Sequence, residues 1–200
     1  MKKIYILLLT ALLLPFGAIA QVEEEVTFGT DSIQLSGTLT LPNAGQKYPV
    51  VVLISGSGPQ DRDSQLLGFK PFKILSDSLV KKGVAVLRYD DRGVGKSTGK
   101  SVGMSTSEEL AEDVREAVAF LKRHPAIDTQ NIGLIGHSEG GIIAPKVAAD
   151  NPDIAFIVLM AGFGVKGIEL SNAQGAAIMR ASGMPEEFIK RSGDMNGRVI

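Results

Sequence analysis

The stretch NIGLIGHSEGGIIA at residues 131–144 joins an apolar run, a serine flanked by glycines and a second apolar run. The first run is typical of a buried strand, and the second, beginning at Gly140, is typical of a helix. Between them, GHSEG fits the pattern Gly-x-Ser-x-Gly, in which a sharp turn from strand to helix exposes a serine. Glycine at Gly136 and Gly140 would let strand and helix pass closely. The stretch therefore predicts a strained turn that presents Ser138 as a candidate nucleophile.

The same pattern occurs twice more, as GKSTG at residues 95–99 and GKSVG at residues 99–103. Both copies lie in a polar loop rich in glycine and serine, with no buried strand before them and no helix directly after them. Since the turn depends on that context, Ser138 is the preferred candidate over Ser97 and Ser101. The alternative for Ser138 is an ordinary glycine-rich turn.

Strand and helix patterns alternate on both sides of this stretch. Two segments that alternate apolar and polar residues, 23–30 and 32–41, predict a hairpin. Apolar runs then predict strands over 49–55, 84–89, 131–136 and 155–161. Helical spacing predicts helices over 72–82, 108–122 and 139–149, the second capped by Thr106 or Ser107. This order predicts an α/β fold with a mostly parallel sheet covered by helices on both faces.

Composition excludes several classes of site and partner. The chain has no cysteine and only two histidines, so a disulfide framework, a thiolate nucleophile and a His- or Cys-based metal site are not expected. Its net charge is −1 and no basic patch is visible, which argues against binding nucleic acid. We expect no cofactor, and a small molecule as the partner. The oligomeric state stays open.

The first twenty residues are typical of a signal peptide. Lys2 and Lys3 precede an apolar run over 4–14, and Ala18-Ile19-Ala20 fits a cleavage site. A membrane anchor is the alternative, but the run is shorter than the roughly 20 residues that a spanning helix needs. We therefore expect cleavage after Ala20, a secreted or periplasmic protein, and only transient membrane contact through the signal peptide.

Three motifs follow predicted strands in order: LISGSGPQDRD at 53–63, YDDRGVGKS at 89–97 and GHSEGG at 136–141. With them, residues 30–164 resemble the α/β-hydrolase superfamily, in its secreted esterase-like branch described as serine aminopeptidase-like or dienelactone-hydrolase-like. The resemblance implies a serine hydrolase that acts on carboxylic esters or thioesters through an acyl-enzyme. A peptidase with aminopeptidase-like specificity is the enzymatic alternative, and a non-catalytic binding protein of the same fold is the third.

The resemblance also implies roles for particular residues. Ser138 would be the nucleophile, and the backbone N–H groups of Ser57 and Glu139 would form the oxyanion hole. Gly136 and Gly140 would be the glycines of the elbow. A plain β-to-α turn is the alternative for the glycines around Ser57.

The loop after the strand 84–89 also looks like the end of a phosphate-binding P-loop. That motif needs a glycine where this chain has Asp90, and two adjacent carboxylates would repel phosphate. We expect instead that Asp90, Asp91 and Arg92 structure the loop, with one of the carboxylates pairing with Arg92. A substrate contact is the alternative.

Neither histidine fits the role of general base. His137 adjoins the nucleophile position, where neighbouring side chains point in different directions, and His124 is expected to be a solvated residue at a helix end. In the resembling family the acid and then the histidine follow the serine in the chain, after later strands. We therefore expect residues 21–164 to be the N-terminal part of a hydrolase core, truncated after the sixth strand, and 165–200 to begin a helical lid. This fragment is expected to be inactive alone, with an exposed edge on its sixth strand.

Overall fold

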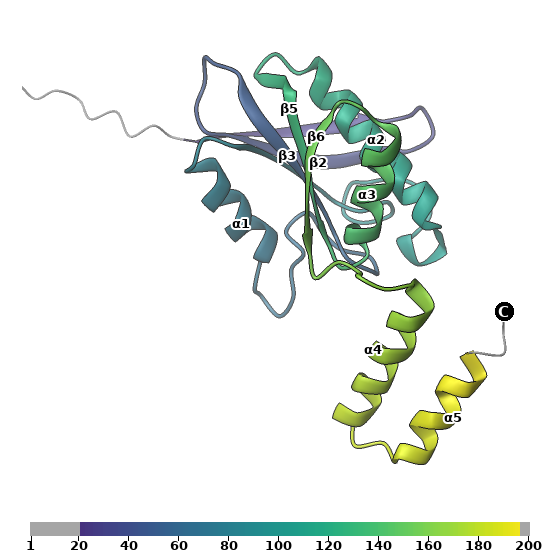
Figure 1. The fold of residues 1–200 in the computed structure, drawn as a ribbon. Helices are drawn as coiled ribbons and strands as arrows, with labels where there is room; N and C mark the ends of the chain where they lie inside the picture. Colours follow the sequence, from purple (N-terminus) through teal and green to yellow (C-terminus); the bar gives the residue numbers. More distant parts are fainter. Residues whose placement is uncertain (1–20, 197–200) are drawn as a thin grey trace, which may run out of the picture.

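The computed structural model describes residues 21–196, and its side chains up to residue 192. The predicted signal peptide lies outside the described residues. The described chain forms one six-stranded sheet in the order β1-β2-β4-β3-β5-β6 (Figure 1). The strands are β1 (Val22–Gly29), β2 (Gln34–Leu41), β3 (Tyr48–Ile54), β4 (Ala85–Tyr89), β5 (Ile127–His137) and β6 (Ile154–Met160).

The sheet is antiparallel at one side and parallel elsewhere. Strand β2 pairs antiparallel with both β1 and β4, whereas the pairs β4–β3, β3–β5 and β5–β6 are all parallel. The predicted hairpin and the mostly parallel sheet are therefore confirmed. The carboxyl ends of β3, β4, β5 and β6 meet at one edge, where ligands bind in sheets of this kind.

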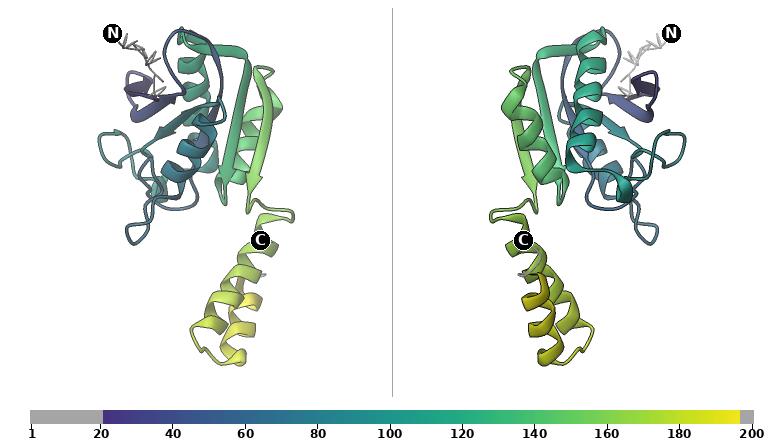
Figure 2. Two further views of the ribbon diagram at one scale, coloured as in Figure 1. Left: turned by 90° about the vertical axis from the view of Figure 1, so that its left-hand side faces the viewer. Right: turned by 90° about the vertical axis from the view of Figure 1, so that its right-hand side faces the viewer.

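Helices cover both faces of the sheet (Figures 1 and 2). Helix α1 (Pro71–Val80) packs on one face, and α2 (Ser107–Arg123) and α3 (Gly140–Asp150) pack on the other. Strand β3 shows why its run of apolar residues is continuous. Val50 and Val52 join the core beneath α2 and α3, while Val51 and Leu53 join the core beneath α1.

Helix α2 begins at a capping box. The Thr106 hydroxyl accepts from the Glu109 N–H, and the Glu109 carboxylate accepts from the Thr106 N–H. This arrangement satisfies two donors that would otherwise lack partners at the helix start. Of the two predicted caps, Thr106 is therefore the one used. The predicted apolar stripe faces the core, with Val114, Val118 and Leu121 fully buried.

Strand β5 starts four residues earlier than predicted. The polar segment 128–130 hides this start in the sequence, but Ile127 is buried and pairs with Tyr48. A shift in register follows between Tyr48 and Val50, so the early part of β5 is a bulged extension. The pattern of apolar residues in the sequence therefore could not predict this extension of β5.

Beyond β6 the chain forms two helices that extend away from the sheet, α4 (Gly167–Ala181) and α5 (Glu186–Asn196) (Figure 2). Arg180 pairs with Glu186 across their connection, at 2.6 Å. No residue of α4 is buried, and β6 exposes Phe156, Val158 and Leu159 at the sheet edge. Among the described residues, no helix is long and apolar enough to cross a bilayer.

Candidate active site

The turn between β5 and α3 carries Ser138. Its φ of +53° lies in the left-handed region, which side-chain-bearing residues rarely adopt. The Ser138 N–H donates to the carbonyl of Met160 at 3.0 Å, and its own carbonyl accepts from the Gly141 N–H at 2.8 Å. These two hydrogen bonds fix the turn between β6 and the first turn of α3. The Ser138 side chain is half-buried at the carboxyl edge of the sheet.

Gly136 and Gly140 each lie where two segments of the backbone come too close together to leave room for a side chain. A β-carbon on Gly136 would overlap the carbonyl of Gly140. A β-carbon on Gly140 would in turn overlap the carbonyl oxygen of Ile54 at the end of β3, and that of Ser55, the next residue, at 2.7 Å. The residue types at 136 and 140 therefore follow from the crossing of strand and helix.

The loop after β3 lies against the serine. A β-carbon on Gly56 would stand 3.2 Å from the Ser138 β-carbon and 3.3 Å from Nδ1 of His137. Ser57, the next residue, lines a cavity together with His137, and His137 also lines a second cavity with Ser138. The structure thus brings together the loop at Gly56 and the turn at Ser138, which lie about eighty residues apart in the sequence.

Asp91 holds both ends of that loop. Its Oδ1 accepts from the Ser55 hydroxyl at 2.7 Å, and its Oδ2 accepts from the Gln60 N–H at 3.0 Å. The Asp91 N–H donates to the Gln60 carbonyl at 3.1 Å. Burial is the main cause that raises the pKa of Asp91 to about 6, against the opposing effect of the Ser55 hydrogen bond. The span from Ser55 to Gln60 is therefore fixed by one buried carboxyl group.

Arg92 does not pair with either neighbouring carboxylate, contrary to the prediction. Its guanidinium grips Asp113 of α2, with Nε–Oδ2 at 2.6 Å and Nη2–Oδ1 at 2.7 Å. Nη2 also donates to the Glu109 carbonyl at 2.6 Å. The side chain of Arg92 extends to α2 because Asp113 and the Glu109 carbonyl there accept hydrogen bonds from its buried guanidinium. Asp90, Asp91 and Arg92 are all buried, and each bonds to a different partner.

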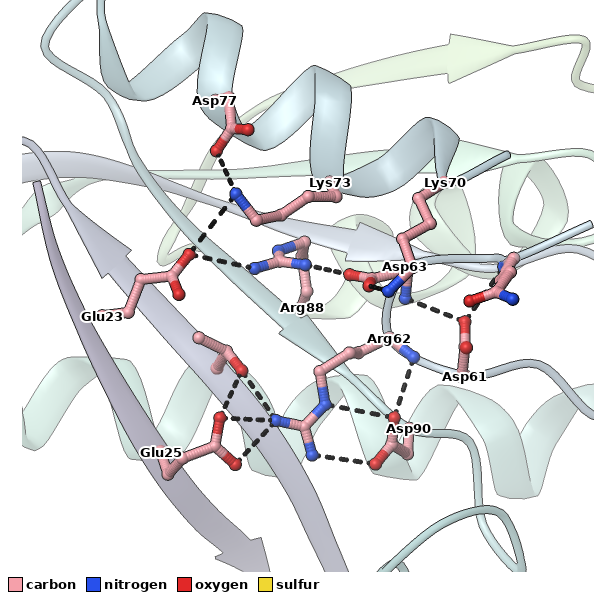
Figure 3. A network of polar contacts seen from close by, with 12 residues as sticks. Glu23, Glu25, Asp61, Arg62, Asp63, Lys70, Lys73, Asp77, Arg88 and Asp90 are labelled. Atoms are coloured by element: carbon pink, nitrogen blue, oxygen red, sulfur yellow. Dashed lines mark hydrogen bonds and ion pairs between the residues drawn. The ribbon is translucent and has the colours of Figure 1, made fainter. Parts of the chain in front are cut away.

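Asp90 pairs with Arg62, which the sequence analysis did not single out (Figure 3). Nη2 of Arg62 lies 2.8 Å from Oδ2 of Asp90, and Nε lies 3.1 Å from Oδ1. Nη1 reaches Glu25 of β1 at 2.8 Å. The hydrogen bonds that Arg62 donates to the Asp90 carboxylate are the main cause that raises the pKa of Arg62. Beside this group, Arg88 of β4 pairs with Asp63, so charged contacts anchor Arg62 and Asp63 to the sheet.

A cavity of about 530 Å³ opens beside this loop. Ser57 and His137 line it, and His137 also lines the cavity at Ser138. Apolar side chains from the loop, α1 and β6 form most of its wall: Pro59, Leu66, Phe69, Pro71, Phe72, Leu75 and Met160. Such a concave, mostly apolar site with a few polar groups is typical of small-molecule binding.

Comparison with known proteins places this arrangement in a family. The family described as "Serine aminopeptidase, S33" matches residues 70–187. The chain belongs to this family. Esterase EstD of Thermotoga maritima is 35% identical to this S33-family chain over 114 residues, which are 57% of the chain and 27% of EstD.

Solved structures agree on the fold of the S33-family chain. An esterase of Pyrococcus furiosus aligns with a TM-score of 0.65 and 23% identity, over 84% of this chain and 60% of that one. GrgF, an α/β-hydrolase from Penicillium, aligns with a TM-score of 0.60 and 24% identity, over 82% and 54%. The chain therefore has the α/β-hydrolase fold, and it spans 27% of EstD, the first of its curated relatives.

The other two Gly-x-Ser-x-Gly serines of this S33-family chain occupy different settings. The Ser97 hydroxyl is buried, donates to the Asp90 carbonyl at 2.7 Å and accepts from the Ser36 N–H at 2.9 Å. Ser101 is exposed and precedes a short 3₁₀ turn, η1 (Val102–Met104). A β-carbon on Gly95 would come 2.7 Å from the Asp90 carboxylate, so a carboxylate adjoins the glycines that resembled a P-loop.

The prediction of a solvated His124 is wrong. Its side chain is only 13% exposed, packs against Phe120 and places Nε2 3.0 Å from the Glu24 carboxylate of β1. His124 therefore joins the end of α2 to the edge of the sheet. His137 lines both cavities at the Ser138 turn, with Nδ1 facing Gly56.

Proposed function

We propose that this chain belongs to a serine hydrolase that cleaves carboxylic esters or thioesters through an acyl-enzyme on Ser138. The observation that carries the proposal is the left-handed turn at Ser138, placed against the Gly56 loop by a glycine that leaves room for it. A serine held in this way has its hydroxyl at the edge of the sheet where substrates bind. The 35% identity to a protein named an esterase supports the ester as substrate.

In the proposed reaction the Ser138 oxygen attacks the ester carbonyl and loses its proton to a base. The backbone N–H groups of Ser57 and Glu139 stabilise the negative oxygen that forms, the second of them at the start of α3 where the helix dipole favours negative charge. The tetrahedral intermediate then collapses, the C–O bond breaks, and the alcohol leaves with the proton from the base. Water attacks the acyl-enzyme in the same manner and releases the acid.

The general base is proposed to be a histidine outside residues 1–200, together with its acid partner. His124 is engaged with Glu24, and His137 is the residue directly before the nucleophile with its ring toward Gly56. The matched residues make up 27% and 44% of two curated relatives, which supports the proposal that these residues lie outside the given sequence. The helices α4 and α5 would then be the first part of a lid over the site.

A serine aminopeptidase-like activity is the second candidate, and the description of the matching family favours it. The two activities differ in what the site must bind, because a free α-ammonium group needs a carboxylate beside it. Hydrolysis of p-nitrophenyl esters and of aminoacyl p-nitroanilides by the full-length protein separates the candidates. We expect hydrolysis of the ester with no measurable cleavage of the aminoacyl anilide, and Ser138-dependent cleavage of the anilide would establish the peptidase.

Covalent labelling tests the nucleophile itself. A fluorophosphonate should label the full-length protein, and Ser138→Ala should abolish both the label and ester hydrolysis. Ser101→Ala is the matched control, since it alters an exposed serine in the same sequence pattern and should change neither. Labelling that persists in Ser138→Ala would refute the proposal. Residues 1–200 alone should give no burst of product from an activated ester, because they would lack the base.

A further inference from the structure

We propose that the 530 Å³ cavity beside the Ser138 turn binds one uncharged, apolar chain of the substrate, and that Leu66 and Phe69 form its outer wall. The inference rests on the proposed ester hydrolysis at Ser138 and specifies its substrate. The ligand would be an ester in which the acyl or the alcohol part is a medium-length alkyl or an aryl group.

The chemistry of the cavity wall defines this class. Apolar side chains dominate, and the polar side chains in the lining are those of Ser57, Gln60, Ser64, Gln65 and His137. In the described part of the chain, no Lys, Arg, Asp or Glu lines the cavity. A charged substrate group placed there would lose its hydration without gaining a partner. The cavity therefore selects for apolar groups, and its volume falls within the roughly 300–1,000 Å³ of small-molecule sites.

The outer wall is a tight hairpin. Leu66 and Phe69 exchange two backbone hydrogen bonds, both 2.9 Å long, across a two-residue turn. Both turn residues have positive φ, +51° at Leu67 and +84° at Gly68, as a type I′ turn requires. This geometry places the side chains of Leu66 and Phe69 along the cavity, whereas Leu67 at the tip does not line it.

The hairpin exposes apolar surface that nothing in the described chain covers. Leu66 is 70% exposed and Phe69 is 61% exposed, although both line the cavity. Adjacent apolar side chains that stay in water mark a binding surface, because an apolar ligand would remove that surface from water. The exposure of Leu66 and Phe69 therefore agrees with a substrate chain that enters the cavity along these two side chains.

The base of the hairpin is held firmly. One Asp61 carboxylate oxygen accepts from the N–H groups of Asp63 and Gln65, each at 3.0 Å. Asp63 in turn pairs with Lys70 at 3.0 Å and with Arg88 (Figure 3). A wall built on fixed residues has a defined position before the ligand arrives, and pre-organisation of this kind improves affinity.

The cavity also connects with the chemistry. Ser57, whose N–H is proposed to contact the oxyanion, lines the cavity, and His137 lines both this cavity and the one at Ser138. An ester whose carbonyl carbon lies at Ser138 could therefore place its acyl or its alcohol chain along the wall formed by Leu66 and Phe69.

Chain-length kinetics test the inference in the full-length protein. For p-nitrophenyl esters, kcat/KM should rise at least 10-fold from acetate to octanoate, since each buried methylene gains binding energy. Phe69→Ser should reduce kcat/KM for octanoate by about 10-fold, mainly through KM, and leave acetate within about 2-fold. Leu67→Ser is the matched control, because Leu67 is 99% exposed beside the wall, and it should leave the whole series unchanged.

The outcomes separate this inference from the proposed function. If acetate is hydrolysed in a Ser138-dependent way but chain length has no effect in either the acyl or the alcohol series, or Phe69→Ser and Leu67→Ser behave alike, the cavity assignment is overturned and the hydrolase remains. A parallel series of alkyl acetates identifies the part of the ester that is bound. A rise confined to that series would assign the cavity to the alcohol side. Absence of Ser138-dependent hydrolysis of any ester would overturn both.

Discussion

A β-carbon on Gly56 would stand 3.2 Å from the β-carbon of Ser138, closer than most real β-carbon contacts. A larger side chain at this position would have to push into the Ser138 turn or into the ring of His137. We predict that Gly56→Val lowers kcat for ester hydrolysis at least 10-fold, because about 1 Å of displacement at a nucleophile has effects of that size or larger. Steady-state kinetics of the full-length protein measure this.

Gly164→Val is the control for that change. Gly164 follows β6 at a position where an added β-carbon meets no atom within 4 Å. Its kcat should match the unchanged protein. An unaltered kcat in Gly56→Val would show that the loop does not approach the reacting serine.

Removing Asp113 should destabilise the fold strongly. Arg92 is 3% exposed, and Asp113→Ala would leave its guanidinium buried without the carboxylate that it grips. We expect the free energy of unfolding to fall by about 3–5 kcal/mol, as is usual when one partner of a buried ion pair is removed. Urea denaturation followed by circular dichroism measures the change.

The adjacent carboxylate provides the comparison for Asp113. Glu112 is exposed and pairs with Arg115 at 2.6 Å on the surface of α2. Glu112→Ala should therefore cost less than about 1 kcal/mol. Equal losses in the two variants would mean that the Arg92–Asp113 pair adds no more than a surface contact.

Asp91 predicts an unusual dependence of stability on pH. Its folded pKa of about 6 lies above the ordinary value of 3.8, so the folded state holds its proton more tightly than the unfolded state does. The stability that this group contributes is fully present below pH 3.8 and is lost as pH rises toward about 6. Glu25 acts in the opposite direction, because hydrogen bonds to Thr38 and Arg62 lower the pKa of its carboxyl group.

Comparison with Asp91→Asn isolates this contribution, because other groups titrate alike in both proteins. Asparagine keeps the shape of the side chain and can still bond to Ser55 or Gln60. Between pH 4 and pH 7 the variant should gain on the order of 2 kcal/mol in free energy of unfolding relative to the unchanged protein. Urea titrations at several pH values measure the difference, and a difference that stays constant across this range would contradict the prediction.

The capping box of α2 offers a smaller, separate test. Thr106→Ala removes the hydroxyl that accepts from the Glu109 N–H, and should cost about 1 kcal/mol of stability. Thr106→Ser retains an oxygen at the same place and should cost much less. Thermal unfolding of the two variants compares them. If both lose the same stability, the hydroxyl does not contribute as a cap.

Local patterns were enough to predict much of this fold. The apolar run of β3, the glycines at the Ser138 turn and the stripe on α2 each follow from contacts that repeat at short sequence spacing. The partner of Arg92 could not be predicted in the same way. Asp113 lies in the next helix along the chain, whereas Asp90 and Asp91 carry the same charge and are nearer in the sequence.

Long-range pairing also explains what the sequence analysis missed at the candidate site. Nothing in the sequence distinguishes Arg62 from other loop arginines, because Asp90 and Glu25 come close to it only when the strands are ordered in the sheet. The wall of the cavity was missed for a related reason: Leu66 and Phe69 stand in a polar segment, with no periodicity to mark them. The roles of Ser138, Ser57 and Glu139 stay predictions that the experiments above address.

The position of β4 between β2 and β3 has a consequence for how the polypeptide assembles when its N-terminal end emerges first. The hairpin of β1 and β2 is made first, yet its neighbour in the sheet is Ala85–Tyr89, more than forty residues later. Until that strand emerges, one edge of the hairpin has no partner and is open to pairing with other nascent chains. During this interval the edge of β2 that later pairs with β4 is unprotected. A chaperone that binds extended segments would then reduce aggregation of this protein.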